Sequence, residues 1–183
     1  FSRSNWAAYT ALEGDITDWL SFGLAGRFED FSDFGSKFTW KVNARAEFSD
    51  AIAVRGSVNT GFRAPTPGQA NVSSTFANIN ALTGQPFITG IVAPTNPVAL
   101  LFGAQPLRPE ESFNIAAGVV LTPANRLTLT IDYFNIKVED RIGLSGGFTL
   151  TQAQRDQLVA AGIQGGGDFT TIQFFGNAFD SRS

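Results

Sequence analysis

The chain has 183 residues, a net charge of −3 at pH 7 and a sequence pI near 4.9, and this length is typical of one domain. Only 16% of the residues are charged and 43% are hydrophobic, which excludes a solvated disordered chain. The acidic balance gives no footprint for nucleic acid. The absence of cysteine and histidine removes disulfides, thiol nucleophiles, the commonest general base and the commonest metal ligand. This composition disfavours most hydrolases and metalloenzymes and leaves only Lys, Tyr or carboxylate chemistry open. We expect no enzyme activity, no cofactor and no metal site.

Alternation of polar and apolar residues, the period of a strand with one apolar face, dominates the chain. Residues 38–48 show it most clearly, with Phe38 and Trp40 on one face and Thr39 and Lys41 on the other. The same pattern predicts further strands at residues 19–30, 51–63, 111–121 and 126–142, and weaker ones near 4–12 and 171–181. No run of about eighteen apolar residues is present, so no transmembrane helix is predicted. The sequence therefore predicts an all-β fold of about seven strands.

The connections between these strands alternate in length. Three are short turns, at residues 13–18, 49–50 and 122–125, and three are longer, at residues 31–37, about 64–110 and about 144–170. In an up-and-down meander, this alternation places the short turns at one end and the long loops at the other. Outer-membrane barrels have this arrangement, with short periplasmic turns and long extracellular loops. A soluble sandwich has no reason to segregate its loops by length.

The two longest loops differ in their expected local structure. Residues 64–110 are rich in Pro, Asn, Thr and Gly, and no long element is expected there. In the last long loop, Thr151 and Gln154 match a capping box, and residues 152–161 are good helix formers. Gly162 suits the end of that helix. One short helix in an extracellular loop is therefore predicted.

Charged side chains of the predicted strands share the face opposite the apolar one. In a barrel this face would line the polar interior, where opposite charges on neighbouring strands can pair. On the lipid face, each Arg or Lys would cost about 2–4 kcal/mol at the bilayer midplane. Two interpretations remain: a solvated, charge-balanced wall, or a wall that contacts an internal domain or lines a substrate path. The lumen-facing candidates are Arg27, Glu29, Lys41, Arg45, Glu47, Arg55, Arg63 and Asp132.

Aromatic residues lie near the ends of the apolar faces. This position suits the two interfacial girdles of a membrane barrel, although ordinary core aromatics are the alternative interpretation. These residues are Trp19, Phe28, Trp40, Phe48, Phe62 and Tyr133. Ligand selectivity is expected in the two longest loops, because binding residues concentrate on loops held by a rigid scaffold. Candidate contacts there, which equally suit packing within the loop, are Phe76, Asn78, Phe87 and Phe102.

Four segments carry motifs that occur together, in this order, in one family. They are RFEDFSDFG at 27–35, RGSVNTGFRAPTPG at 55–68, LRPEESFNIAAGVVLTPANRLTLTIDYFNIKVEDRIG at 107–143 and FFGNAFDSRS at 174–183. The set resembles the barrel of a TonB-dependent outer-membrane receptor. The resemblance implies an antiparallel up-and-down transmembrane β-barrel segment, about seven strands of a larger barrel of about 22 strands with a plugged lumen.

The resemblance also implies a function and a set of partners. The expected function is energised uptake of a scarce nutrient, such as a siderophore–iron complex, across the bacterial outer membrane. The expected partners are outer-membrane lipid, the receptor's own plug domain, the energy-coupling protein TonB and a small-molecule or chelate ligand. Residues 1–183 contain no plug domain and no motif that TonB grips. Since the chain begins at Phe1 without a Met or a signal peptide and ends in an apparent strand, we expect a partial barrel domain.

Three alternatives share parts of this pattern. A passive outer-membrane porin or small β-barrel has the same strands, but the long, charge-poor loops disfavour it. A membrane-barrel hydrolase with a Ser-His site is excluded within this segment by the absence of histidine. A soluble β-sandwich binding domain would stay in water without detergent.

Overall fold

The chain folds into two compact units. The structure, a computed structural model, describes residues 2–79, 82, 84–163 and 166–183, so the expected cut end at Phe1 lies outside the described residues. The first unit, here called the sheet unit, comprises the chain up to Arg63, Pro109–Glu139 and Asp180–Ser183. The second, here called the loop unit, comprises Ala64–Arg108 and Asp140–Phe179.

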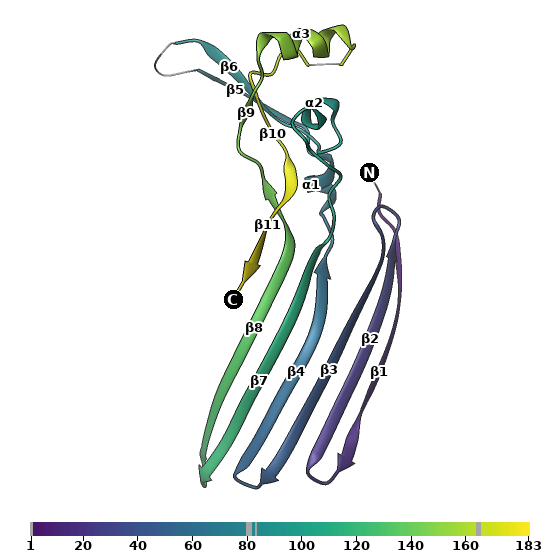
Figure 1. Cartoon of the computed structure of the whole chain (residues 1–183), viewed down its shortest axis with the longest axis vertical. Coiled ribbons are helices and arrows are strands. Elements are labelled where there is room, and N and C mark those ends of the chain that lie inside the picture. Colours follow the sequence, from purple (N-terminus) through teal and green to yellow (C-terminus); the bar gives the residue numbers. More distant parts are fainter. Residues whose placement is uncertain (1, 80–81, 83, 164–165) are drawn as a thin grey trace. The chain divides into compact units, whose positions relative to one another are not determined.

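A seven-stranded sheet has the order β1-β2-β3-β4-β7-β8-β11 (Figure 1). Its strands are β1 (Asn5–Thr17), β2 (Leu20–Phe31), β3 (Gly35–Ser49), β4 (Ile52–Arg63), β7 (Glu110–Ala124), β8 (Leu127–Leu144) and β11 (Phe175–Arg182). The pairs from β1 to β8 are all antiparallel. The seven strands lie side by side in the same order in which they follow one another along the chain, which confirms the predicted meander of about seven strands. The sheet is open, with β1 and β11 at its edges.

The loop unit holds a second sheet of four short strands in the order β5-β6-β10-β9. Its elements are α1 (Pro67–Asn71), β5 (Ser74–Ile79), β6 (Pro86–Ile91), α2 (Pro97–Leu100), β9 (Phe148–Thr149), α3 (Gln152–Ala160) and β10 (Thr171–Gln173). The parallel pairing of β6 with β10 joins the two longest loops of the chain. One hydrophobic core gathers residues from both loops: Val92, Val98, Ala99, Ala104, Leu150, Leu158, Ile172 and Phe174.

The turns at one end of the seven-stranded sheet are tighter than predicted. The turn expected at residues 13–18 contains only residues 18–19, because β1 continues to Thr17. Glu13 and Asp15 pair with residues of β2 in the ladder. The polar composition of this segment, which predicted a turn, therefore belongs to the end of a strand. The three short turns are now alike, with two residues each at 18–19, 50–51 and 125–126. A register shift in the ladder adjoins each of them.

The connection predicted at residues 31–37 is also shorter than expected. β2 ends at Phe31 and β3 begins at Gly35, which leaves three turn residues. Gly35 has φ +85°, a left-handed conformation that glycine adopts without a steric penalty. The Arg3 guanidinium pairs with the Asp33 carboxylate of this turn at 2.5 Å. The long connections of the chain are therefore the two that build the loop unit.

The predictions for the two longest loops are confirmed in part. As expected, no described element of residues 64–110 is longer than six residues. The segment also contains two short helices and a hairpin, which its composition did not predict. The single strand predicted at residues 171–181 is wrong: β10 belongs to the four-stranded sheet and β11 to the seven-stranded one. Phe174, between them, is buried in the core of the loop unit, and this burial interrupts the alternation.

The predicted helix of the last loop is confirmed as α3. Thr151 is its N-cap, and both hydrogen bonds of the capping box with Gln154 are present. The helix ends at Ala160 and its C-cap is Ala161, one position before the predicted cap at Gly162, which follows with φ +71°. Among the described residues, every helix is too short or too polar to cross a membrane.

Candidate functional site

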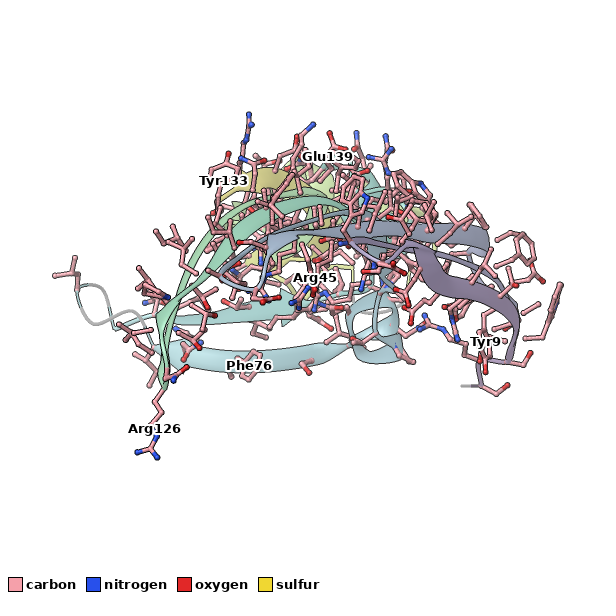
Figure 2. All side chains as sticks on the ribbon, turned by 90° about the horizontal axis from the view of Figure 1, so that it is seen from below. Tyr9, Arg45, Phe76, Arg126, Tyr133 and Glu139 are labelled. Atoms are coloured by element: carbon pink, nitrogen blue, oxygen red, sulfur yellow. The ribbon has the colours of Figure 1, made fainter. Side chains whose placement is uncertain are left out.

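The ladder register assigns the side chains of the sheet unit to two faces, because directly paired residues of antiparallel strands share a face. All eight charged residues predicted to face a lumen share one face. Arg45 pairs with Arg55, Arg55 with Gly118, and Gly118 with Asp132. Figure 2 shows Arg45 on the concave side of the curved sheet and Tyr133 on the convex side. That the concave face lines a barrel lumen stays a prediction.

Most of the predicted charges are neutralised in pairs on the concave face. The strongest geometry is that of Arg55, whose Nη2 donates to both carboxylate oxygens of Asp132 at 2.8 and 2.9 Å. The other three pairs of this face are Arg27–Glu29 at 2.6 Å, Arg45–Glu47 at 2.8 Å and Arg63–Glu110. Lys41 lies between Ala25 and Asn59 in the ladder and lines a hollow of about 430 Å³ together with Arg45, Arg55 and Asp132.

Gly118 provides the space for the pair of Arg55 and Asp132. It lies on β7, between the two charged residues in the ladder. A Cβ atom at Gly118 would lie 2.0 Å from Asp132 Oδ1 and 3.2 Å from Arg55 Nε. The ion pair therefore crosses β7 only because this position has no side chain.

We expect Gly118→Ala to displace the Asp132 carboxylate and to lower the free energy of unfolding by about 1 kcal/mol, the upper end for an exposed pair. Equilibrium urea unfolding of the full-length protein measures this change. In an Asp132→Ala background the new methyl group has nothing to displace, so the loss caused by Gly118→Ala should largely vanish. The same loss in both backgrounds would contradict the proposed role of Gly118.

Arg63 pairs with Glu110, a partner that was not predicted from the sequence. Arg63 is the last residue of β4, Glu110 is the first of β7, and the two are directly paired. Arg63 Nε donates to a Glu110 carboxylate oxygen at 2.8 Å, and Glu110 is only 5% exposed. The sequence held one signal of this pair: Arg63 and Glu110 carry opposite charges at the two ends of one predicted loop.

The convex face of the sheet unit is apolar and exposed. Phe38 is 62% exposed, and Ile131, three strands further along the sheet order, is 61% exposed. Of the buried hydrophobic residues among those described, only Ala53 lies in the sheet unit, so this sheet is a single layer without its own core. A continuous apolar surface of this kind marks a protein or membrane interface.

Aromatic residues form one border of this apolar face, which we call the aromatic border. One lies on each strand from β1 to β8 in the seven-stranded sheet: Trp6, Phe28, Phe38, Phe62, Phe113 and Tyr133. The next convex positions beyond four of them are polar: Asp30, Ser36, Glu111 and Asn135. From β1 to β8 the border moves along the strands toward the short turns. In β1 it is Trp6, which pairs with Asp30 near the end of β2, whereas in β8 it is Tyr133, which pairs with Ala117 in the middle of β7. Strands tilted about 35–45° in a membrane barrel produce such a slanted line.

The predicted girdle residues all belong to the convex side or to its turns. At the short-turn end, the ring centroids of Trp19 and Phe48 are 6.5 Å apart. Trp40 lies on the same face as Phe38, and its ring centroid is 6.5 Å from that of Phe113. The aromatic rings thus contact one another at both ends of the apolar face. Their contact with a membrane interface stays a prediction.

The four candidate ligand contacts occupy the loop unit. Phe76 and Asn78 are exposed on β5, and Phe87 is half-buried on β6. Phe102 packs against the core, with its ring 5.1 Å from that of Phe148, which favours packing as its role. Among the described residues, no three acidic side chains lie close enough to hold a metal ion.

Asn177 joins three segments of the loop unit. Its Nδ2 donates to the carbonyl oxygens of Arg108 and Asp140 at 2.9 and 2.6 Å, and its Oδ1 accepts from the Arg108 backbone N–H at 2.8 Å. The Arg108 guanidinium also donates to Asp140 Oδ1 at 2.6 Å. Asp140 has φ +55°, a conformation that non-glycine residues adopt mainly where surrounding contacts impose it. These bonds hold that strained backbone in place.

The sequence matches the family model described as "TonB dependent receptor-like, beta-barrel" over residues 1–182. The chain belongs to this family. Solved structures of siderophore receptors align with nearly all of the chain. The siderophore receptor PirA from Pseudomonas aeruginosa is 18% identical, with a TM-score of 0.70 over 98% of this chain and 29% of that one. PirA from Acinetobacter baumannii is also 18% identical, with a TM-score of 0.62 over 98% and 24%.

A variant of the ferric enterobactin receptor PfeA from Pseudomonas aeruginosa, in complex with enterobactin, has a TM-score of 0.71 at 11% identity and covers 98% of this chain and 23% of that one. This chain therefore spans less than a third of each of these receptors. No curated protein matches the sequence. At these identities the similarity shows the fold alone. Together with the family match over residues 1–182, it confirms the predicted segment of a TonB-dependent receptor barrel.

Proposed function

We propose that this chain forms part of an outer-membrane receptor for energised uptake of a scarce nutrient, such as a siderophore–iron complex. Membership of the TonB-dependent receptor family carries the proposal. The two faces of the sheet unit support it independently. An exposed apolar face with an aromatic border suits contact with lipid, and an opposite face of paired charges suits a polar interior.

The proposal gives each part of the chain a role. The convex face contacts outer-membrane lipid. The concave face contacts the plug domain of the same receptor or lines the substrate path, and TonB acts through a region outside residues 1–183. The loop unit contributes to binding a small-molecule or chelate ligand, with Phe76 and Asn78 as exposed candidates. The receptor takes part in transport and not in catalysis.

Uptake measurements test this function directly. In the bacterium that carries the gene, we expect its deletion to abolish uptake of radiolabelled iron from at least one siderophore under iron limitation. The intact gene should restore uptake, but only in cells with a functional TonB. A passive porin would instead admit many small solutes with or without TonB. Uptake that is unchanged for every chelate tested, or independent of TonB, would contradict the proposal.

A further inference from the structure

A groove interrupts the apolar convex face over β1, β2 and β3. Its volume is about 660 Å³, within the range of about 300–1,000 Å³ that is typical of ligand sites. Its convex-face lining combines three small residues, Ala8, Thr10 and Gly26, with five large apolar ones. These are Leu12, Leu24, Phe28, Phe38 and Trp40.

Gly26 has no side chain, and the end of the Phe38 ring lies over it. Gly26 pairs with Thr10 on one side and Trp40 on the other. A Cβ atom at this position would lie 3.3 and 3.4 Å from Cζ and Cε2 of Phe38, so even a methyl group would press against that ring. A larger side chain at Gly26 would displace the Phe38 ring, and the two side chains together would occupy the groove.

The groove runs along the strands, away from the aromatic border. At the border, the ring centroids of Trp6 and Phe28 are 5.3 Å apart. From Phe28 toward the start of β2, the next residues on the same face are Gly26 and Leu24. The distance from residue 28 to residue 24 is about 13 Å at about 3.3 Å per residue. The residues that line the groove carry no charge. These features match an extended hydrocarbon chain.

We propose that this groove holds one acyl chain of a membrane lipid, with the chain lying along β1 to β3 and its polar end toward the aromatic border. The inference rests on the proposed function, because that function places the convex face in contact with lipid, and the groove is continuous with this face. An acyl chain elsewhere in the bilayer already lies in hydrocarbon. Retention in the groove therefore comes from close contact with Phe38, Trp40 and the leucines.

A photoreactive lipid tests this site. The full-length receptor is reconstituted in vesicles of phosphatidylcholine that contain a small fraction of phosphatidylcholine with a diazirine on one acyl chain. After illumination, mass spectrometry measures the cross-linking yield of each peptide. We expect the peptides of β1, β2 and β3 to give several-fold higher yields than those of β7 and β8. Gly26→Leu should remove most of this excess.

Gly56→Leu is the matched control. Gly56 also lies on the convex face, between Ala44 and Ala117 in the ladder, and a Cβ atom there would meet only the Ala116 carbonyl oxygen at an ordinary 3.6 Å. This variant should leave the excess at β1 to β3 unchanged. Equal yields over the whole convex face, or an excess that survives Gly26→Leu, would overturn the groove but keep the lipid-facing assignment. No cross-linking on the convex face would overturn that assignment as well.

Discussion

Ala117→Arg is expected to lower the free energy of unfolding in a bilayer by about 2 kcal/mol, the lower end of the midplane cost, because its ladder partner Tyr133 belongs to the aromatic border, whereas Ala116→Arg is expected to change it by about 1 kcal/mol or less. These neighbours lie near the middle of β7, and both are exposed. Ala117 pairs with Tyr133 on the convex face, and Ala116 pairs with Ser57 on the concave face. An arginine at Ala117 would be placed in hydrocarbon, but one at Ala116 would join the charged wall near Asp132.

Reversible urea unfolding of the full-length receptor in phospholipid vesicles measures both values. The two variants share the residue type, the strand and the added charge, so their difference reports only the face. Similar losses for the two, or a larger loss at Ala116, would contradict a lipid-facing convex surface. The comparison also tests the soluble alternative, because a sheet with water on both faces would accept either arginine at little cost.

The faces of the sheet could be predicted from the sequence because the sheet is a single layer. In the middle of such a sheet, the parity of a residue along its strand decides which face its side chain shares. The eight charged candidates thus share one face, and aromatic residues border the other. The ion pair of Arg55 and Asp132 was out of reach, because these residues lie 77 positions apart and their juxtaposition over Gly118 depends on the register of three strands.

The loop unit could not be predicted by the same reasoning. Its strands contain two to six residues, too few for a periodic pattern to stand out. β6 and β10 pair across about 80 residues of chain, with Thr171 opposite Thr89. Helix α3 was predictable because its capping box is local in the sequence. The position of Ile172 beside Gly90 and Phe148 depends on contacts that only the folded chain creates.

Ile172→Ala is expected to destabilise the loop unit by about 2–5 kcal/mol, the usual cost of such a truncation in a packed core. Ile172 is 0% exposed, and it lies on β10 at the centre of the four-stranded sheet. Its side chain belongs to the core that joins both loops. The sheet unit has its own ladder of backbone hydrogen bonds, so we expect the loss to appear as local opening of the loop unit.

Hydrogen exchange of the full-length receptor, followed by mass spectrometry, distinguishes local from global opening. Peptides that cover β6, β9 and β10 should exchange at least about tenfold faster in Ile172→Ala, since each 1.4 kcal/mol is a factor of ten, while those of β2 to β4 should not change. Ile172→Val should give a smaller effect, of about 0.5–1.5 kcal/mol. Ile79→Ala, at a 72% exposed position of β5, should change little. Faster exchange throughout β2 to β4 would show that the loop unit and the sheet unit unfold together, against their description as separate compact units.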